Sequence, residues 1–186
     1  MEDVFRRVIG ALEQVGIPYM LTGSFASSYH GAPRATQDID VVISATPEQL
    51  TRLVELLPRA EYYVDRGAAL EAHRMQGQFN VIDLATGWKV DLMMRKSRPF
   101  SQEEFARRYV VDFGGIRLSV ATAEDVLIAK LEWAKLGASQ RQIEDAASIL
   151  RIRLTDIDQQ YISRWVRQLR LDEQWEAARR IAGVSS

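Results

Sequence analysis

The sequence predicts an α+β protein in which helices alternate with strands up to about residue 120 and only helices follow. Two observations support this division. Short apolar runs of strand length all lie before residue 121, whereas apolar residues from Thr122 onward recur at helical spacing. No internal repeat and no low-complexity linker interrupts the chain. We therefore expect a core domain over residues 1–120 and a helical subdomain over residues 121–186.

The first third of the chain should contain three helices and two strands. Apolar side chains at helical spacing from Val4 to Val15 predict the first helix. Thr46 and Gln49 have the spacing of a capping box, and Pro47 suits the first helical position. In order, we expect a helix over 2–15, a strand over 17–22, a short helix opened by Ser24, a strand over 38–43 and a helix that ends near Leu57.

Strands and capped helices account for most of the remaining chain. Thr86-Gly87 and Gly114-Gly115 are plausible hairpin turns between strand-like runs. Capping-box spacing recurs at Ser101, Thr122 and Ser139, and each of these residues should begin a helix. We expect strands over 79–85 and 88–94, two more within 108–120, and helices near 123–136, 140–151, 156–169 and 172–182.

The composition excludes several classes of function. The chain has no cysteine, which excludes disulfides, thiolate chemistry and zinc–thiolate sites. No run approaches the ~18 apolar residues of a membrane span, and the N-terminus is unlike a secretory signal. We therefore expect a cytoplasmic protein with no membrane partner. The formal net charge of −1 provides no global attraction to nucleic acid. The arginines crowded into the last 36 positions favour a solvated helix face, with a local basic surface as the alternative.

Two aspartates in one predicted strand are the most informative feature of the chain. Asp38 and Asp40 alternate with Ile39, so both side chains should lie on the same face of a sheet. Strands rarely carry acidic residues, and like charges held so close repel unless a cation lies between them. A hard divalent cation with oxygen ligands, Mg²⁺ above all, meets this requirement.

A phosphate-binding turn should precede the two aspartates. Gly23 allows the backbone to approach a phosphate closely, and Ser24 begins a helix whose N-terminal amides favour anions. Arg34 and Thr36 add a guanidinium and a hydroxyl suited to nucleotide phosphates. The alternative for Gly23-Ser24 is an ordinary strand-to-helix turn with a serine cap.

A third strand carboxylate completes the candidate site. Asp91 lies between Val90 and Leu92, whose side chains should point to the opposite face. If its strand lies beside the strand of Asp38 and Asp40, three carboxylates share one face. Three carboxylates are what a two-metal phosphoryl-transfer site needs.

These residues resemble the signature of the DNA-polymerase-β-type nucleotidyltransferase superfamily. The resemblance rests on the Thr-Gly-Ser of 22–24, the Asp-Ile-Asp of 38–40 and the later strand acid Asp91. It implies a mixed, mainly antiparallel sheet with flanking helices, followed by a C-terminal helical bundle. Thirteen residues separate Ser24 from Asp38, which is long for the family but within its range.

The resemblance also implies a role for each of these residues. Gly23 and Ser24 would hold the triphosphate of an NTP such as ATP. Asp38 and Asp40 would bind two Mg²⁺ ions, with Mn²⁺ as a substitute, and Asp91 would act as a metal ligand or general base. The implied reaction moves a nucleoside monophosphate to an acceptor hydroxyl and releases pyrophosphate.

The helical half is similar to that of toxin-type nucleotidyltransferases from abortive-infection (type IV toxin–antitoxin) systems. The similarity rests on residues 124–133 and on the run from Arg141 to Asp145. Those proteins carry a Lys on one helix and an Asp on the next that approach the active site, which implies such roles for Lys130 and Asp145. The residues themselves leave alternatives open. Lys130 could reach a phosphate or extend to water from an apolar stripe, and Asp145 could form a surface ion pair with Arg141.

The sequence leaves the acceptor and the partner open. A tRNA, a small-molecule antibiotic or a protein side chain would all use the same core, and a toxin or antitoxin is a candidate partner. The alternative that is not an enzyme is a non-catalytic antitoxin or scaffold with the same fold. The three intact acids argue against it. The remaining polar residues are expected in ordinary roles, with Asp83 exposed in a hairpin and His30 and His73 in turns or at the surface.

Overall fold

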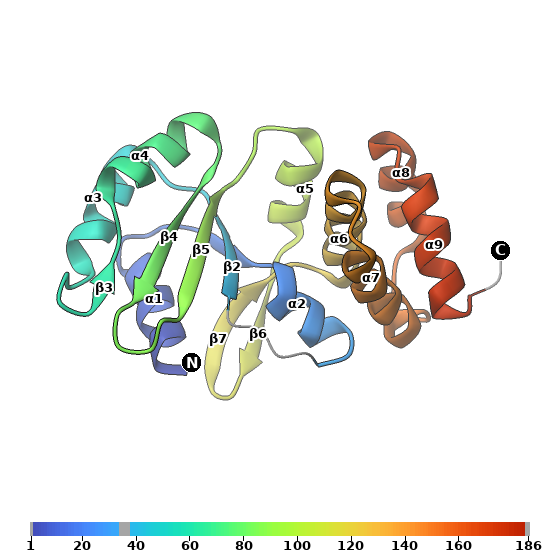
Figure 1. The fold of residues 1–186 in the computed structure, drawn as a ribbon, viewed down its shortest axis with the longest axis horizontal. Coiled ribbons are helices and arrows are strands. Elements are labelled where there is room, and N and C mark those ends of the chain that lie inside the picture. The colour runs from blue at the N-terminus through green and yellow to red at the C-terminus, as the bar shows by residue number, and fades with distance from the viewer. Residues whose placement is uncertain (1, 34–37, 185–186) are drawn as a thin grey trace. The chain divides into compact units, whose positions relative to one another are not determined.

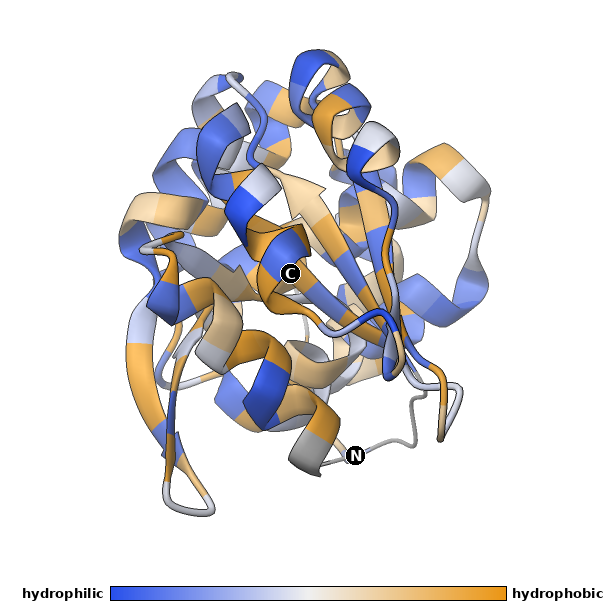
Figure 2. Ribbon diagram, turned by 90° about the vertical axis from the view of Figure 1, so that its left-hand side faces the viewer, coloured by the Kyte–Doolittle hydropathy of each residue, from blue (hydrophilic) through white to orange (hydrophobic). Residues whose placement is uncertain are grey.

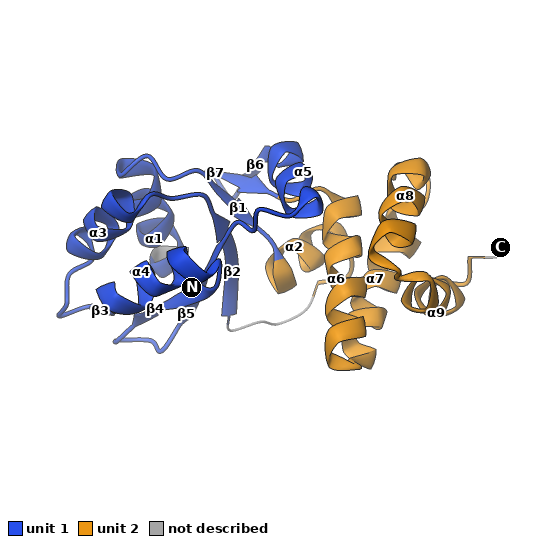
Figure 3. Cartoon of the chain, turned by 90° about the horizontal axis from the view of Figure 1, so that it is seen from above, with its two compact units in different colours: residues 1–22, 36–120 blue, residues 23–35, 121–186 orange. Residues whose placement is uncertain are grey.

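The structure is a computed structural model that describes residues 2–33 and 38–184 of the 186-residue chain. By its internal contacts the chain divides into two compact units (Figure 3). Unit 1 comprises residues 1–22 and 36–120, and unit 2 comprises residues 23–35 and 121–186. This division has a break between residues 120 and 121, as expected, but it also assigns residues 23–35 to the unit of the C-terminal helices. The two-domain organisation over 1–120 and 121–186 therefore remains a prediction.

Unit 1 is built on a mixed seven-stranded sheet (Figure 1). Parallel pairing joins β2 to β5 and β1 to β7, and the other neighbours are antiparallel. This arrangement confirms the expected mixed, mainly antiparallel sheet. The strand order is β3 (Tyr62–Tyr63), β4 (Gln78–Asp83), β5 (Lys89–Met94), β2 (Asp38–Ile43), β1 (Tyr19–Leu21), β7 (Ile116–Val120) and β6 (Tyr109–Phe113).

One face of the central strands is an apolar core. Along β2 the buried residues Ile39, Val41 and Ile43 alternate with more exposed ones, and Val90 and Leu92 of β5 are in register with the first two of them. The helices of this unit are α1 (Glu2–Gln14), α3 (Pro47–Leu56), α4 (Arg66–Met75) and α5 (Pro99–Arg107). Helix α4 packs on β4 and β5, and α3 packs against α1 and α4. Each fully buried aliphatic side chain contributes about 1.5–3 kcal/mol, so this face fixes the register of the strands.

Unit 2 is all helical. It contains α2 (Gly23–His30), α6 (Ala123–Gly137), α7 (Gln140–Arg153), α8 (Gln159–Leu169) and α9 (Asp172–Ala182). Helices α6 and α7 pack against each other, α2 contacts both of them, and α9 packs on α7. In the ribbon of the whole chain, hydrophobic and hydrophilic residues alternate along the helices (Figure 2), as expected of amphipathic helices that bury one face. None of the described helices has the length and apolarity needed to cross a membrane.

Hydrogen bonds from the short segment after α2 explain why residues 23–35 belong to unit 2. The Ala32 amide donates to the Ser148 hydroxyl at 2.8 Å, and Arg153 Nε donates to the His30 carbonyl at 3.3 Å. Gly31 lies so close to α7 that a Cβ at this position would come within 3.0 Å of Ser148 Oγ and 3.3 Å of Ile149. The glycine is therefore required by close packing.

Several local expectations from the sequence are wrong. Helix α5 begins at Pro99 with Arg98 as its N-cap, so Ser101 lies inside the helix and accepts a hydrogen bond from Arg98 Nε instead of capping. Ser139 occupies the N-cap of α7 but forms no capping bond. Asp83, expected to be exposed, is only 5% exposed, and His30, expected in a turn or at the surface, is the last residue of α2 and only 2% exposed. Asp83 stays in its hairpin, where its carboxylate accepts from the Thr86 amide and hydroxyl at 2.8 and 2.6 Å.

Candidate active site

The three predicted carboxylates lie on two strands that pair side by side. In the parallel pairing of β2 with β5, Asp40 is directly opposite Asp91 and Asp38 is opposite Lys89. Residues in register across two strands project to the same face, so Asp38, Asp40 and Asp91 share one face of the sheet. On that face the acids range from exposed Asp38 through half-buried Asp40 to Asp91, which is 7% exposed.

Lys89 supplies the positive charge between these carboxylates, and the sequence analysis did not identify it. Its ammonium lies 3.0 Å from Asp91 Oδ2 and 3.6 Å from Asp38 Oδ1. The hydrogen bond to Asp91 raises the pKa of Lys89 above its ordinary value, against the opposite effect of burial. The signal was present in the sequence, because Lys89 is two residues before Asp91 and must share its face.

Two buried oxygen atoms in this row have no hydrogen-bond partner among the described residues. Asn80 of β4 lies opposite Asp91 on the side away from Asp40, so Asp40, Asp91 and Asn80 form one row across three strands. Asp91 Oδ1 and Asn80 Oδ1 are both buried and unpaired. A buried acceptor without a partner costs about 1–3 kcal/mol, more for a charged group, so each such atom requires an explanation.

The oxygen atoms of this row are chemically suited to bind a divalent cation. The row offers carboxylate and amide oxygens, which are the ligands that Mg²⁺ and Mn²⁺ prefer. The unpaired Asp91 Oδ1 provides a coordination position that no described donor satisfies. The side chains are not gathered around a single point, however: among the described residues no three acidic or histidine side chains form a cluster that could hold a metal ion.

The predicted phosphate turn begins where the sheet ends. The Thr22 amide donates to the Asp40 carbonyl at 3.0 Å, which ties the chain after β1 to β2. Gly23 follows with φ of +60°, a left-handed conformation that favours glycine, and it is the first residue of α2. Ser24 therefore lies in the first turn of the helix. Arg34 and Thr36, the other predicted nucleotide contacts, lie outside the described residues.

Lys130 and Asp145 form a buried ion pair within unit 2. Lys130 Nζ of α6 lies 2.9 Å from Asp145 Oδ2 of α7, and the two side chains are 5% and 13% exposed. Of the alternatives that the sequence left open for Lys130, extension to water is wrong, because the ammonium meets a buried carboxylate. Breaking one side of such a pair typically costs about 3–5 kcal/mol, so the pair also holds α6 and α7 together.

A second buried acid of unit 2 has a structural role that the sequence analysis missed. Asp125 is fully buried, accepts a hydrogen bond from the Tyr161 hydroxyl of α8 and bonds the hydroxyl of its own N-cap, Thr122, at 2.6 Å. His30 is similar in kind, since its Nε2 lies 2.8 Å from the Ala121 carbonyl. Burial lowers the pKa of His30, which keeps its ring neutral. Neither residue requires a ligand to explain it.

Comparison with known proteins identifies the fold. No protein-family model matches the chain, and none of the curated proteins matches it. Among solved structures, ANT(2'')-Ia in complex with adenylyl-2''-tobramycin is similar with a TM-score of 0.60 and 12% identity, over 92% of this chain and 97% of that one. An antigenic nucleotidyltransferase-like protein from Paracoccidioides brasiliensis has a TM-score of 0.54 and 14% identity over 93% and 90% of the chains.

A third structure, the lincomycin-bound lincosamide antibiotic adenylyltransferase LnuA, has a TM-score of 0.51 and 13% identity over 80% of this chain and 98% of its own. At identities this low the likeness establishes the fold alone. The chain shares the α+β fold of these nucleotidyltransferase structures, which agrees with the fold that its sequence signature implied.

Proposed function

We propose that the protein is a divalent-metal-dependent nucleotidyltransferase that moves a nucleoside monophosphate from an NTP to an acceptor hydroxyl. The observation that carries this proposal is the register of β2 and β5, which sets Asp40 opposite Asp91 and leaves the buried Asp91 Oδ1 unpaired. A buried carboxylate oxygen without a hydrogen-bond partner weakens the fold, and a substrate or metal site would explain why Asp91 Oδ1 is kept in this position.

Asp38, Asp40 and Asp91 are the residues that would hold Mg²⁺ or Mn²⁺. A bound cation neutralises charge on the triphosphate and on the departing pyrophosphate. The ammonium of Lys89, which lies 3.0 Å from Asp91 and 3.6 Å from Asp38, supports the proposal that this face holds positive charge. For a divalent ion to take that position, Lys89 would turn toward the phosphates, where a lysine ammonium is equally useful.

The chain's own residues would complete the transfer. Asp91 would act either as a metal ligand or as the general base. In the second role its Oδ1 would accept the proton of the attacking hydroxyl, whose oxygen forms a bond to the α-phosphorus as the bond to pyrophosphate breaks. The first-turn amides of α2, from Gly23 and Ser24, would bind the triphosphate. The likeness of the helical half to toxin-type nucleotidyltransferases supports a role for Lys130 in stabilising phosphate charge, with Asp145 orienting it through their 2.9 Å contact.

We propose a small-molecule hydroxyl as the acceptor. Two of the similar structures are named for antibiotic acceptors, tobramycin in one case and lincomycin in the other, and their shared fold supports this choice. A tRNA end, a protein side chain and a toxin–antitoxin setting use the same core, and the experiment below distinguishes them.

The test incubates the protein with each α-labelled NTP, Mg²⁺ and, in separate reactions, an aminoglycoside and lincosamide panel, total RNA or cell lysate. We expect the label to move to a small molecule and pyrophosphate to be released. Asp40→Asn and Asp91→Asn should each lower turnover at least a thousandfold, whereas Asp172→Asn, at an exposed position in α9, should retain it. Label on RNA or on a protein would show that the acceptor is not a small molecule. Turnover that survives both substitutions would show that these aspartates do not form the active site.

A further inference from the structure

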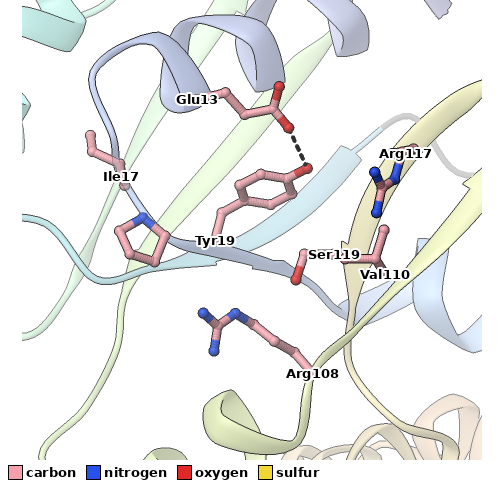
Figure 4. Close-up of a pocket in the computed structure, with 8 residues that line it drawn as sticks. Glu13, Ile17, Tyr19, Arg108, Val110, Arg117 and Ser119 are labelled. Carbon is pink, nitrogen blue, oxygen red and sulfur yellow. Dashed lines mark hydrogen bonds between the residues drawn. The ribbon is translucent and has the colours of Figure 1, made fainter.

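A separate pocket in unit 1 is lined by arginines that the proposed reaction does not use. Figure 4 shows Ser119 between Arg108 and Arg117, with the Tyr19 hydroxyl pointing toward Glu13. The cavity that these residues line has a volume of about 460 Å³. The cavity volume falls within the range of small-molecule sites, about 300–1,000 Å³. Every residue that lines it belongs to unit 1.

The pocket lies away from the carboxylate row on the same sheet. Tyr19 is in register with Ile43, the last residue of β2, three positions after Asp40. The rise of a strand is about 3.3 Å per residue, so the two positions are roughly 10 Å apart along β2, and the side chains of Ile43 and Asp40 point to opposite faces of the sheet. A ligand here would be a second one, independent of the NTP.

Within the part of the chain that the structure describes, the arginines of the pocket have no anionic partner. Among the described residues no carboxylate lies within ion-pair distance of Arg108 or Arg117. Arg108 is partly buried and fixed in place, because it donates to the Phe105 carbonyl and its guanidinium lies 4.1 Å from the centre of the Phe105 ring. Arg95 lies 5.6 Å from the centre of the same ring. Burial and the charge of Arg95 lower the pKa of Arg108, so an anion would stabilise this charge.

Glu13, next to Tyr19 in the pocket, offers a hydrogen-bond acceptor. The Tyr19 hydroxyl donates to Glu13 Oε1 at 3.2 Å, which orients this exposed carboxylate. Burial and the charge of Glu13 raise the pKa of Tyr19 to about 12, so Tyr19 remains a neutral donor. Glu13 can accept a further hydrogen bond from an amine or hydroxyl.

We infer that this pocket binds a small molecule that carries a phosphate or carboxylate group. Arg108 and Arg117 bind the anionic group, Ser119 adds a hydroxyl, and Glu13 accepts from a donor group of the same molecule. Arginine suits this role because its planar guanidinium matches both oxyanions with paired hydrogen bonds.

The test is a titration followed by the backbone amide signals of Tyr19 and Ser119, with EDTA present so that no divalent ion is bound. Inorganic phosphate, acetate and O-phosphoethanolamine are the probes. We expect saturable shifts at both amides. Arg117→Gln, at an exposed position, and Arg108→Gln should weaken binding at least tenfold, whereas Arg59→Gln should not. Glu13→Gln should weaken O-phosphoethanolamine about threefold and spare inorganic phosphate.

The probes and variants separate the outcomes. Saturation by phosphate alone identifies a phosphorylated ligand, and saturation by acetate alone identifies a carboxylate; either supports the inference. Shifts that do not saturate with any probe, or that persist in Arg117→Gln, overturn it. Asp40→Asn should leave the binding unchanged, so the result is independent of the proposed transferase activity.

Discussion

Lys89 has two opposing effects at the candidate site. It stabilises the carboxylates of β2 and β5, and it would compete with a metal ion for them. Its contacts at 3.0 Å with Asp91 and 3.6 Å with Asp38 balance charge when no metal is bound. Like carboxylates without a cation repel one another. Lys89 thus explains how the fold tolerates these neighbouring carboxylates when no metal ion is bound.

Replacing Lys89 by Met should make stability depend on metal. Without metal, we expect the free energy of unfolding to fall by about 1–2 kcal/mol, the low end for a partly buried pair because Lys89 is partly exposed. With Mn²⁺ the loss should be recovered, since the cation no longer competes with the ammonium. Thermal melts in EDTA and in Mn²⁺ measure both effects. Lys96→Met, at an exposed position, is the control, and an Mn²⁺-induced rise no larger than in the wild type would contradict the competition.

His30 makes a second residue-level prediction, on the pH dependence of stability. Its pKa is lower in the folded protein than in the unfolded chain, mainly because of burial. As pH falls below the ordinary histidine value near 6.5, the unfolded chain therefore binds the proton first and the free energy of unfolding decreases. His30→Gln can keep the hydrogen bond to Ala121 and should reduce this decrease in urea melts between pH 7 and 5.5. A slope in His30→Gln that equals that of the wild type would contradict the prediction.

At the scale of elements, two similar capping sequences lead to different structures. Thr122 accepts from the Asp125 amide at 3.3 Å and bonds the Asp125 carboxylate, whereas Ser139 forms no side-chain capping bond. The spacing of a capping box identifies a helix start, and the side-chain rotamer decides whether the bond forms.

The two caps should therefore respond differently to alanine. Thr122→Ala removes a capping bond and one partner of the buried Asp125, and we expect it to cost about 1–2 kcal/mol of unfolding free energy. Ser139→Ala should change the unfolding free energy by less than about 0.5 kcal/mol. Urea denaturation of both variants gives the comparison. Equal losses would mean that the hydroxyl of Ser139 caps α7 in solution.

Most elements could be predicted because their signals are local. The alternation in β2 and the capping box of α3, which forms as expected between Thr46 and Gln49, need no distant partner. Helix α4 was not predicted. Only Ala69 and Ala72 of its ten residues are buried, and two small side chains leave no clear apolar stripe.

The candidate site was predictable in its residues but not in its contacts. The sequence indicated that Asp38, Asp40 and Asp91 would share a face if their strands paired, and the register confirms this condition. That pairing joins strands separated by two helices and two other strands, so no local pattern could establish it. The arginine pocket has no sequence signal at all, since α1, β1, β6 and β7 each contribute to it.

At the scale of the whole molecule, the chain passes between its two units three times. Two consecutive domains, as the sequence predicted, would require a single passage. After β1 the chain forms α2, which packs on α6 and α7, and the chain then returns to the sheet as β2. The predicted phosphate turn therefore belongs to unit 2, whereas the three acids belong to unit 1. The stability of α2 should follow that of the C-terminal helices, although α2 lies between two strands in sequence.

Native-state hydrogen exchange can test this coupling. Leu150→Ala removes a fully buried side chain of α7, and Leu53→Ala is the matched change in α3; each should cost about 2–5 kcal/mol. Because local opening follows packed units, we expect Leu150→Ala to speed amide exchange in α2, α6 and α7 more than in β2 and β5. Leu53→Ala should show the reverse, with α2 little affected. If the amides from Ser27 to Gly31 instead follow the strands in both variants, α2 is stabilised by the sheet, and residues 1–120 form the cooperative core that the sequence first indicated.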